Sequence, residues 1–512
     1  MLTKSDLLSY IQCPKRLWLE KHRANDIPPP DKDMLRRATD GNLVGEKARE
    51  LLGEAKLWPK STGDMATSAA KAWADIRAGG GKPAVEVPMV NGDLYARADA
   101  VLPTQGGFVL RETKASSFPL KPDKVTPAGP ESHHVDDLAI QAWAMEGSGE
   151  QLARTELNLL NGRWRYPGGG DYSGLFRQLD VTEAVSQRVK DIPIILQSAL
   201  HAVAGEIPHA TTGPHCDRPY ECPFKKSCAA SEPPRPEHPV ELLPDSAGKK
   251  LAGKLRAQKG YLSILEPAST ELVGAQSALY QRIQLAHRSG KPVLEVGAKA
   301  IVEALSYPRF YFDFEGIDLP VPRWAGTRPY EQVVFQWSCH VERSPGVFEH
   351  AAFLDLSGGD PSLACAERMR EVLGTVDGPI IVYHATYEKT RFRELGERHP
   401  ELVPLMDSYT ARIFDLLPVV KAHFYHPSMR GSFSIKKVLP VIAPDLNYQV
   451  LEGVSGGTDA QIAYLHATSG KCNEEESTRI RSELLRYCAQ DTWAMVEVAY
   501  FLAGRPRPTR PG

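Results

Sequence analysis

The sequence predicts an α/β protein with more than one domain. Its 512 residues exceed what one ordinary hydrophobic core holds, so two or three domains are expected. Helix-like and strand-like segments alternate along the chain, and polar residues with catalytic chemistry fall on or next to the strand-like ones. Residues 231–246 are rich in proline and charge and lack an apolar period, which is typical of a solvated linker.

These boundaries divide the chain into blocks. We expect an N-terminal domain over residues 1–232, a linker with a helical connector over 233–305, and a C-terminal domain over 306–505, followed by a tail at 506–512. The second boundary lies near Tyr307, just before an apolar run. The tail is rich in proline and arginine and is expected to be disordered.

Composition narrows the class of protein only a little. The chain is 42% hydrophobic and 24% charged, with a formal net charge of −2, which neither requires nor excludes a nucleic-acid partner, since positive charge can be confined to one groove. No apolar run approaches the roughly 18 residues of a membrane helix, and the N-terminus lacks the features of a signal peptide. We therefore expect a cytoplasmic protein without a membrane partner, whose eight cysteines are thiols or metal ligands rather than disulfides.

The N-terminal block reads as a mixture of helices and strands. Its apolar residues recur near helical spacing in the segments 5–22, 41–52, 136–145 and 181–204. Strand-like segments cover residues 84–88, 94–102 and 107–113. A turn that contains two glycines joins the last two strands, so these are expected to be neighbours.

A first set of catalytic candidates lies on these two strands. Asp99 is in the first strand, and Glu112 and Lys114 lie at positions i and i+2 near the end of the second, so their side chains share a face. Two carboxylates on adjacent strands can hold Mg²⁺ or Mn²⁺, which lowers the pKa of a bound water and polarises a phosphodiester. The lysine could orient that water or stabilise developing charge. The alternative is an edge strand with an exposed Glu-x-Lys pair.

The cysteines point to a second kind of site in the same block. Cys216, Cys222 and Cys228 follow one another at C-x5-C-x5-C spacing, and Cys13 stands alone about 200 residues upstream. Four thiolates are enough for a zinc ion or a [4Fe–4S] cluster, and the absence of C-x2-C knuckles favours the iron–sulfur cluster. The alternative is a loop with incidental cysteines.

Together these residues resemble the iron–sulfur branch of the RecB-like nucleases, within the PD-(D/E)xK superfamily. The resemblance covers about residues 1–232 and implies a restriction-endonuclease-like fold stapled by the cluster. It implies that Asp99, Glu112 and Lys114 form the catalytic motif, with Gln141 on the helix that follows. The family usually has a metal-contacting histidine where this chain has Gly45, and the adjacent Glu46 is a candidate substitute.

The C-terminal block contains a second set of acidic residues. Asp313 and Glu315 lie at i and i+2 on a strand that emerges from an apolar run, and Glu388 comes just after a later strand. Tyr487 and Asp491 lie one turn apart on one face of a late helix. The alternative is that the first pair caps a strand and the last pair lies on the surface.

This order resembles the DEDD family of 3′→5′ exonucleases, in its tyrosine subtype, which has an RNase H-like fold. The resemblance implies that Asp313, Glu315, Glu388 and Asp491 hold two Mg²⁺ ions and that Tyr487 orients the attacking water. The second motif departs from the family pattern, because Glu388 replaces an aspartate. The whole chain resembles a bacterial family that fuses these two kinds of domain.

The sequence therefore predicts a metal-dependent nuclease that hydrolyses phosphodiester bonds, with exonuclease action expected. DNA is favoured over RNA as its partner, either single-stranded or with free ends, in repair, recombination or defence. Arg430, Lys436 and Lys437 could contact a phosphate backbone, although a charged, solvated helix is the more common explanation for such residues. The alternative function is a nucleic-acid-binding or redox-sensing scaffold in which one or both sites are inactive.

Overall fold

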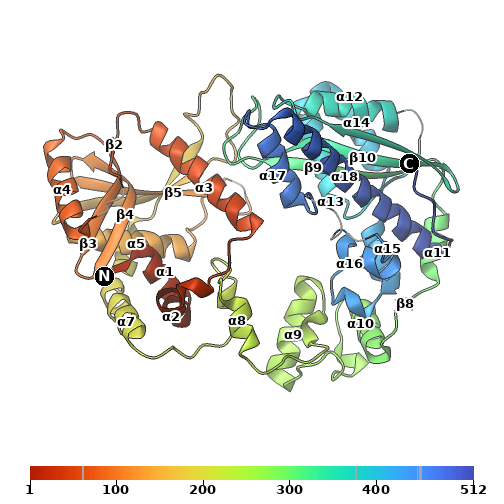
Figure 1. Cartoon of the computed structure of the whole chain (residues 1–512), viewed down its shortest axis with the longest axis horizontal. Helices are drawn as coiled ribbons and strands as arrows, with labels where there is room; N and C mark the ends of the chain where they lie inside the picture. The colour runs from red at the N-terminus through yellow and green to blue at the C-terminus, as the bar shows by residue number, and fades with distance from the viewer. Residues whose placement is uncertain (60–62, 124, 375–376, 447, 449–452, 512) are drawn as a thin grey trace. The chain divides into compact units, whose positions relative to one another are not determined.

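The computed structural model describes residues 1–59, 63–123, 125–374, 377–446, 448 and 453–511 (Figure 1). The chain divides into two compact units. Unit 1 contains Met1–Pro234 and Leu319–Glu331, and unit 2 contains Arg235–Asp318 and Gln332–Gly512. Both units contain helices and strands, which confirms the α/β class. The expected connector, 233–305, falls almost entirely in unit 2 instead of standing alone.

Unit 1 is built on a seven-stranded sheet in the order β2-β3-β4-β5-β6-β7, with β1 paired to β4. The pairs β3–β4, β4–β5 and β6–β7 are antiparallel, and β5–β6 is parallel. The strands are β1 Leu2–Thr3, β2 Lys56–Leu57, β3 Ala84–Asn91, β4 Leu94–Thr104, β5 Gly107–Ser117, β6 Leu152–Leu160 and β7 Phe176–Asp180.

The helices of unit 1 are α1 Lys4–Gln12, α2 Pro14–His22, α3 Lys32–Glu50, α4 Met65–Ala78, α5 Ser132–Glu146, α6 Thr182–Val189, α7 Ile192–Ala204 and α8 Lys225–Ala230. The helix expected over residues 5–22 is broken at Cys13, because the residue before Pro14 avoids helical backbone angles and is extended here. Helix α5 packs on β3, β4 and β6, and its buried Leu138 and Ile140 join the core of the unit.

The loop that follows β9 belongs to unit 1 even though it lies between two strands of unit 2. The backbone N–H of Tyr166 donates to the carbonyl of Thr327 at 2.8 Å, and the Tyr330 hydroxyl donates to the carbonyl of Ala115 at 2.5 Å. Val321 is buried in an apolar cluster with Leu160 and with Val44 of α3. This loop is therefore a structural part of the N-terminal unit.

Unit 2 contains a five-stranded sheet in the order β11-β10-β9-β12-β13 and a separate pair of β14 with β8. Strands β9, β10 and β11 are antiparallel neighbours, whereas β12 runs parallel to β9 and β13. The strands are β8 Val293–Leu294, β9 Arg309–Asp318, β10 Gln332–Ser344, β11 Val347–Leu354, β12 Ile380–Val382, β13 Ile413–Asp415 and β14 Phe424–Tyr425.

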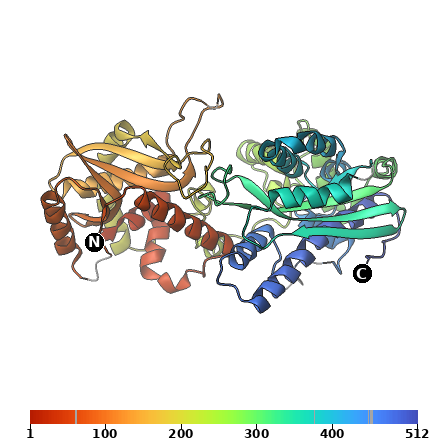
Figure 2. The same ribbon diagram turned by 90° about the horizontal axis from the view of Figure 1, so that it is seen from above.

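The helices of unit 2 are α9 Asp245–Lys259, α10 Ser277–Ser289, α11 Gly297–Glu303, α12 Ser362–Leu373, α13 Thr386–Arg398, α14 Val403–Ala411, α15 Leu416–His423, α16 Ile435–Ile442, α17 Gly457–Ala467 and α18 Glu474–Leu502. Helix α18 runs along β9 and β10, drawn in dark blue in both views (Figures 1 and 2). Residues of the expected connector share one buried apolar core with β9, α15 and α18. No helix of the described residues is long and apolar enough to cross a membrane.

Candidate active sites

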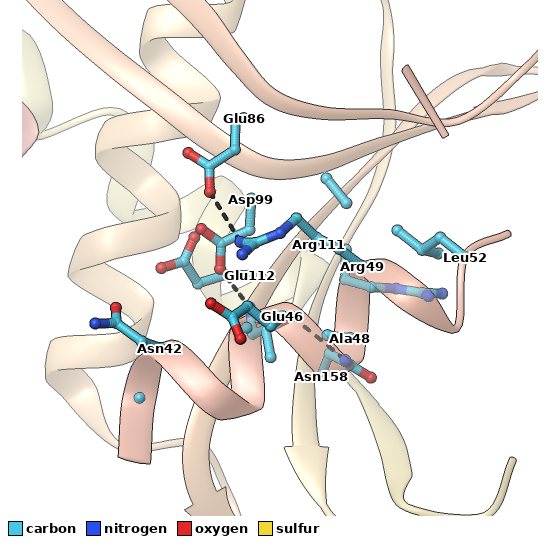
Figure 3. Close-up of a pocket in the computed structure, with 14 residues that line it drawn as sticks. Asn42, Glu46, Ala48, Arg49, Leu52, Glu86, Asp99, Arg111, Glu112 and Asn158 are labelled. Carbon is cyan, nitrogen blue, oxygen red and sulfur yellow. Dashed lines mark hydrogen bonds and ion pairs between the residues drawn. The ribbon is translucent and has the colours of Figure 1, made fainter. Parts of the chain in front are cut away.

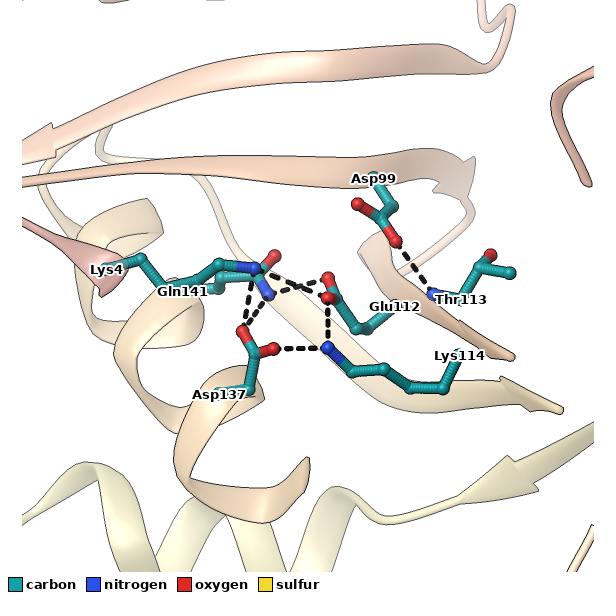
Figure 4. Close-up of polar contacts among 7 residues, drawn as sticks. All are labelled: Lys4, Asp99, Glu112, Thr113, Lys114, Asp137 and Gln141. Carbon is teal, nitrogen blue, oxygen red and sulfur yellow. Dashed lines mark hydrogen bonds and ion pairs between the residues drawn. The ribbon is translucent and has the colours of Figure 1, made fainter. Parts of the chain in front are cut away.

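The first acidic site lies where β4 and β5 pair in unit 1. The register that joins Ala100 to Arg111 brings Asp99 and Glu112 side by side on the two strands. The backbone N–H of Thr113 donates to Asp99 Oδ2 at 2.9 Å and orients that carboxylate (Figure 4). The predicted pair of carboxylates is thus assembled by one local hairpin.

Glu112 is held in a buried polar network that includes two of the other predicted residues, Lys114 and Gln141. Lys114 Nζ lies 2.7 Å from Glu112 Oε1, and Gln141 Nε2 donates to Glu112 Oε2 at 2.7 Å. Asp137, one turn before Gln141 on α5, accepts from the same Gln141 Nε2 at 2.9 Å and from Lys114 Nζ at 2.5 Å. Lys4 Nζ lies 3.3 Å from Glu112 and 2.8 Å from Asp137. The structure therefore brings Glu112, Lys114 and Gln141 together.

Two members of this network, Lys4 and Asp137, were not among the sequence candidates. Asp137 carried a usable signal, because it lies at i−4 from Gln141 and so shares its helix face. Lys4 carried none, since 108 positions separate it from Glu112. Burial alone lowers the pKa of an ammonium group, yet the neighbouring carboxylates raise the pKa of Lys4 and Lys114 above the ordinary value.

A cavity of about 290 Å³ opens beside Asp99 and Glu112 (Figure 3). Gly45 and Glu46 of α3 form part of its wall. Gly45, which stands where the RecB-like nucleases usually have a histidine, therefore does face this site. A further carboxylate, Glu86 of β3, also lines the cavity and was not predicted. Its side chain lies 3.2 Å from Arg49 and 3.2 Å from Arg97. The cavity wall therefore offers carboxylate oxygens from four elements, namely α3, β3, β4 and β5.

The carboxyl group of Asp99 has a raised pKa in this cavity. Burial first, and then repulsion from Glu112, raise its pKa to about 7, although the Lys4 ammonium and the Thr113 N–H act in the opposite direction. A proton or a cation at Asp99 would relieve the same repulsion. The donor set fits a hard divalent ion, because carboxylate oxygens are its preferred ligands.

The four predicted cysteines of unit 1 line a single pocket. Cys13 caps the end of α1, Cys216 and Cys222 come from the segment that leads into α8, and Cys228 lies within α8. Gln12 fastens this loop to α1, because its Nε2 donates to the carbonyls of His215 and Tyr220 at 2.7 and 2.8 Å. All eight cysteines of the chain are free of disulfides, and burial raises the pKa of the Cys222 thiol.

The second acidic site lies in unit 2, where β9 passes beneath α18. Asp313 and Glu315 project from β9 and Asp491 from α18, and carboxylate oxygens of the three lie within 4.8 Å of one another. Glu315 and Asp491 are each 8% exposed. In the described residues, one other group of three donors is this close, namely His466 near the end of α17, Cys472 in the connection that follows and Glu476 in the first turn of α18. Asp99 and Glu112 belong to neither group.

Glu388 and two tyrosines complete the second site. Glu388, in the first turn of α13, is 2% exposed, and its Oε2 accepts no hydrogen bond in the part of the chain that the structure describes. Its charge acts on Asp313. Tyr487 hydrogen-bonds to Asp491, and so does Tyr448, whose hydroxyl lies 2.5 Å from Asp491 Oδ1. All five predicted residues thus gather around one centre, and Tyr448 is added to them.

A lysine of α16, Lys436, carries a positive charge that acts on Asp313, Glu315 and Asp491. Lys436 Nζ lies 5.3 Å from the ring centre of Tyr448 and 5.2 Å from that of Tyr487. Its charge opposes the repulsion among the carboxylates. The sequence had already marked Lys436 as a possible phosphate contact.

The start of α13, which carries Glu388, is fixed by an aspartate at the end of β13. Asp415 accepts hydrogen bonds from the backbone N–H groups of His384 and Ala385, both at 2.9 Å, and from that of Leu417 at 3.0 Å. His384 adopts a φ of 79°, a strained value for a residue with a side chain. Asp415 therefore supports the loop that delivers Glu388 to the cluster.

Burial and mutual repulsion raise the pKa values of the carboxylates in the second site. Burial is the larger cause for each, and neighbouring carboxylates add to it at Asp313, Glu315 and Glu388. The pKa is raised to about 8 for Glu315 and for Glu388, and the pKa of Asp313 is raised well above its ordinary value. At neutral pH the metal-free cluster therefore retains protons, which a divalent cation would displace.

Sequence comparisons match parts of the chain only. A family model described as "Domain of unknown function (DUF2779)" matches residues 310–434, a stretch that includes Asp313, Glu315 and Glu388. "Uncharacterized protein MG366" of Mycoplasma genitalium is 23% identical over 216 residues, which cover 39% of this chain and 32% of that protein. "Uncharacterized protein UU173" of Ureaplasma parvum is 25% identical over 219 residues, or 39% and 31% of the two chains. The matches thus span about a third of these relatives.

The raised pKa values predict that the metal-free protein becomes less stable as pH rises. An ordinary glutamate has a pKa of 4.5, whereas the pKa of Glu315 and Glu388 is about 8 in the folded chain. The folded state therefore binds more protons than the unfolded state between these values, so stability present below pH 4.5 is lost as pH rises to 8. Melting temperatures measured in EDTA from pH 4.5 to 8.5 should fall, and Mn²⁺ should restore stability at pH 8.

Other groups also titrate in this window, so a variant isolates the contribution of the cluster. The double variant with Glu315→Gln and Glu388→Gln lacks two of the mutually repelling carboxylates. Its melting temperature should therefore decline less steeply as pH rises. Glu371→Gln, at an exposed glutamate of α12, serves as the matched control and should keep the wild-type slope. Equal slopes for all three proteins would contradict the assignment.

Proposed function

We propose that this protein is a metal-dependent nuclease and that unit 2 carries the main hydrolytic site. The supporting observation is the approach of Asp313, Glu315 and Asp491 to within 4.8 Å in a buried setting. Glu388, whose Oε2 has no hydrogen-bond partner among the described residues, acts on the same centre. Buried like charges at this spacing are costly unless cations neutralise them. The donor set fits two hard divalent ions bound by carboxylate oxygens.

The unit 2 site supports the RNase H-like, DEDD-type exonuclease reading of the sequence. Strand β9 is central in the sheet and carries the first two carboxylates, and α18 contributes the fourth together with Tyr487. Mg²⁺ or Mn²⁺ held by Asp313, Glu315, Glu388 and Asp491 would activate water and stabilise the leaving oxygen. The Tyr487 hydroxyl orients that water, and the Lys436 ammonium attracts the phosphate of the substrate.

Unit 1 supports a second, PD-(D/E)xK-type site at Asp99, Glu112 and Lys114. The carboxylates of Asp99 and Glu112 face a cavity with further oxygen donors, and Glu46 stands beside Gly45 in its wall. Lys114 lies at hydrogen-bond distance from Glu112 and is charged, so it can stabilise negative charge that develops on a phosphate. Gln141 keeps Glu112 oriented through its amide.

The four cysteines are proposed to hold a [4Fe–4S] cluster. The sulfurs of a tetrahedral zinc site with Zn–S bonds of about 2.3 Å lie about 3.8 Å apart. In the described residues, no group of three or more ligand atoms within 4.8 Å includes Cys13, Cys216, Cys222 or Cys228. Their wider spacing around one pocket supports a group larger than a single ion.

The proposed partner is DNA that is single-stranded or has free ends, with RNA as the alternative substrate. A second candidate function is a nucleic-acid-binding or redox-sensing scaffold. It is favoured at unit 1 by one observation, namely that both oxygens of Glu112 are already engaged by Lys4, Lys114 and Gln141. A site whose metal ligand is satisfied by its own side chains could have lost its catalytic ion.

Cleavage assays with single-site variants test the nuclease proposal. In Mn²⁺, Asp313→Asn should reduce digestion of end-labelled single-stranded DNA by about two orders of magnitude or more, because the metal site loses a ligand. Asp99→Asn measures how much of the cleavage depends on the unit 1 site in the same assay. Comparison with circular DNA tests for a requirement for free ends, and Glu371→Gln is the control. Absence of cleavage by the wild type on both DNA and RNA would contradict the nuclease proposal and favour the scaffold.

Metal analysis of anaerobically purified protein tests the cluster proposal. The wild type should be brown and contain iron and sulfide, whereas Cys13→Ser should lose most of both, because one of four ligands is missing. Cys472→Ser changes a half-buried cysteine outside the pocket and should retain the colour. A colourless wild type with one zinc per chain would overturn the iron–sulfur assignment.

A further inference from the structure

Lys4 and Asp137 add a charge pair to the unit 1 site that neither the sequence motif nor the comparisons assign. Each ammonium of the site, Lys4 and Lys114, contacts both Glu112 and Asp137, so two cations alternate with two anions (Figure 4). Gln141 donates from one nitrogen to both carboxylates. Glu112 and Asp137 are 3% and 4% exposed, so the loss of either lysine would leave a buried carboxylate charge without part of its compensation.

The position of Lys4 is fixed by the backbone on both sides. It directly follows β1, which pairs with β4, the strand that carries Asp99. It is also the first residue of α1, whose N-cap residue Thr3 forms a capping box with Asp6. Asp6 in turn pairs with Lys21 of α2 at 2.7 Å. The Lys4 ammonium is therefore delivered to Glu112 from a rigid element and is not a mobile surface charge.

The charges of this site must be redistributed when a cation binds. Asp99, Glu112 and Asp137 carry up to three negative charges against two positive ones on Lys4 and Lys114. A divalent ion at Glu112 competes with both ammonium groups, because Oε1 of Glu112 is their shared partner. Asp137 lies within ion-pair distance of both lysines, so it remains their counter-charge after Glu112 has turned to the ion.

We propose that Lys4 and Asp137 are positioning residues that set the divalent-cation affinity of the unit 1 site in opposite directions. Lys4 lowers the affinity, because it competes for Glu112 and repels the cation. Asp137 raises the affinity, because it holds the two ammonium groups away from Glu112 when the cation enters. This inference rests on the proposed function, in which Asp99 and Glu112 bind the metal.

Mn²⁺ binding to the full chain tests this inference without relying on activity. The background protein carries Asp313→Asn and Asp491→Asn, so that the unit 2 site does not contribute to the titration. In isothermal titration at pH 8.5, Lys4→Met should bind Mn²⁺ about threefold or more tightly than the background, since one repelling charge is gone. Asp137→Asn should bind about tenfold more weakly, as is usual when a partner of a metal ligand is lost.

The opposite signs separate this mechanism from a merely structural role. If the two residues only stabilise the fold, both variants should weaken binding and lower the melting temperature together, and that result would overturn the inference. Lys4→Arg keeps the charge and should stay close to the background affinity. Added Asp99→Asn should abolish the binding that remains in the background. If the background binds no Mn²⁺ that depends on Asp99, the proposed metal site itself fails, and the inference fails with it.

Discussion

Carboxylates buried beside one another need a positive counter-charge, and both candidate sites are organised by the way in which they obtain it. In unit 1 the charge is built in, because Lys4 and Lys114 lie within ion-pair distance of Glu112. In unit 2 the lysine at 436 is more remote, and the cluster retains protons through raised pKa values. The first site thus has two lysines to offset its carboxylates in the absence of a metal, whereas the second has the stronger demand for a cation.

The sequence was sufficient to predict which residues lie together wherever local backbone geometry brings them together. Asp99, Glu112 and Lys114 come from one hairpin, and Tyr487 and Asp491 from one helix turn, so alternation and helical spacing bring them together. Lys4 and Tyr448 escaped prediction because their contacts with Glu112 and Asp491 span 108 and 43 positions without a regular pattern between them. The packing of the predicted helical connector also escaped prediction, since its apolar residues are buried by elements from distant parts of the chain.

Departures from the expected motifs acquire a physical meaning in this context. Gly45 removes a possible ligand from the cavity of unit 1, but Glu46 and Glu86 leave that cavity rich in oxygen donors. Glu388 has a longer side chain than the expected aspartate, and the loop held by Asp415 places its helix next to Asp313. In both cases a substitution in the motif is accompanied by a neighbouring carboxylate or support that keeps the acidic character of the site.

The loop Leu319–Glu331 has a consequence for how the protein can be divided. The chain passes between the two units three times, since it leaves unit 2 after β9, contributes this loop to unit 1 and returns at β10. A fragment that stops at the proline-rich linker would leave Leu160 and Ala115 without their partners Val321 and Tyr330. A fragment with residues 1–234 alone is therefore expected to be less stable than unit 1 within the full chain.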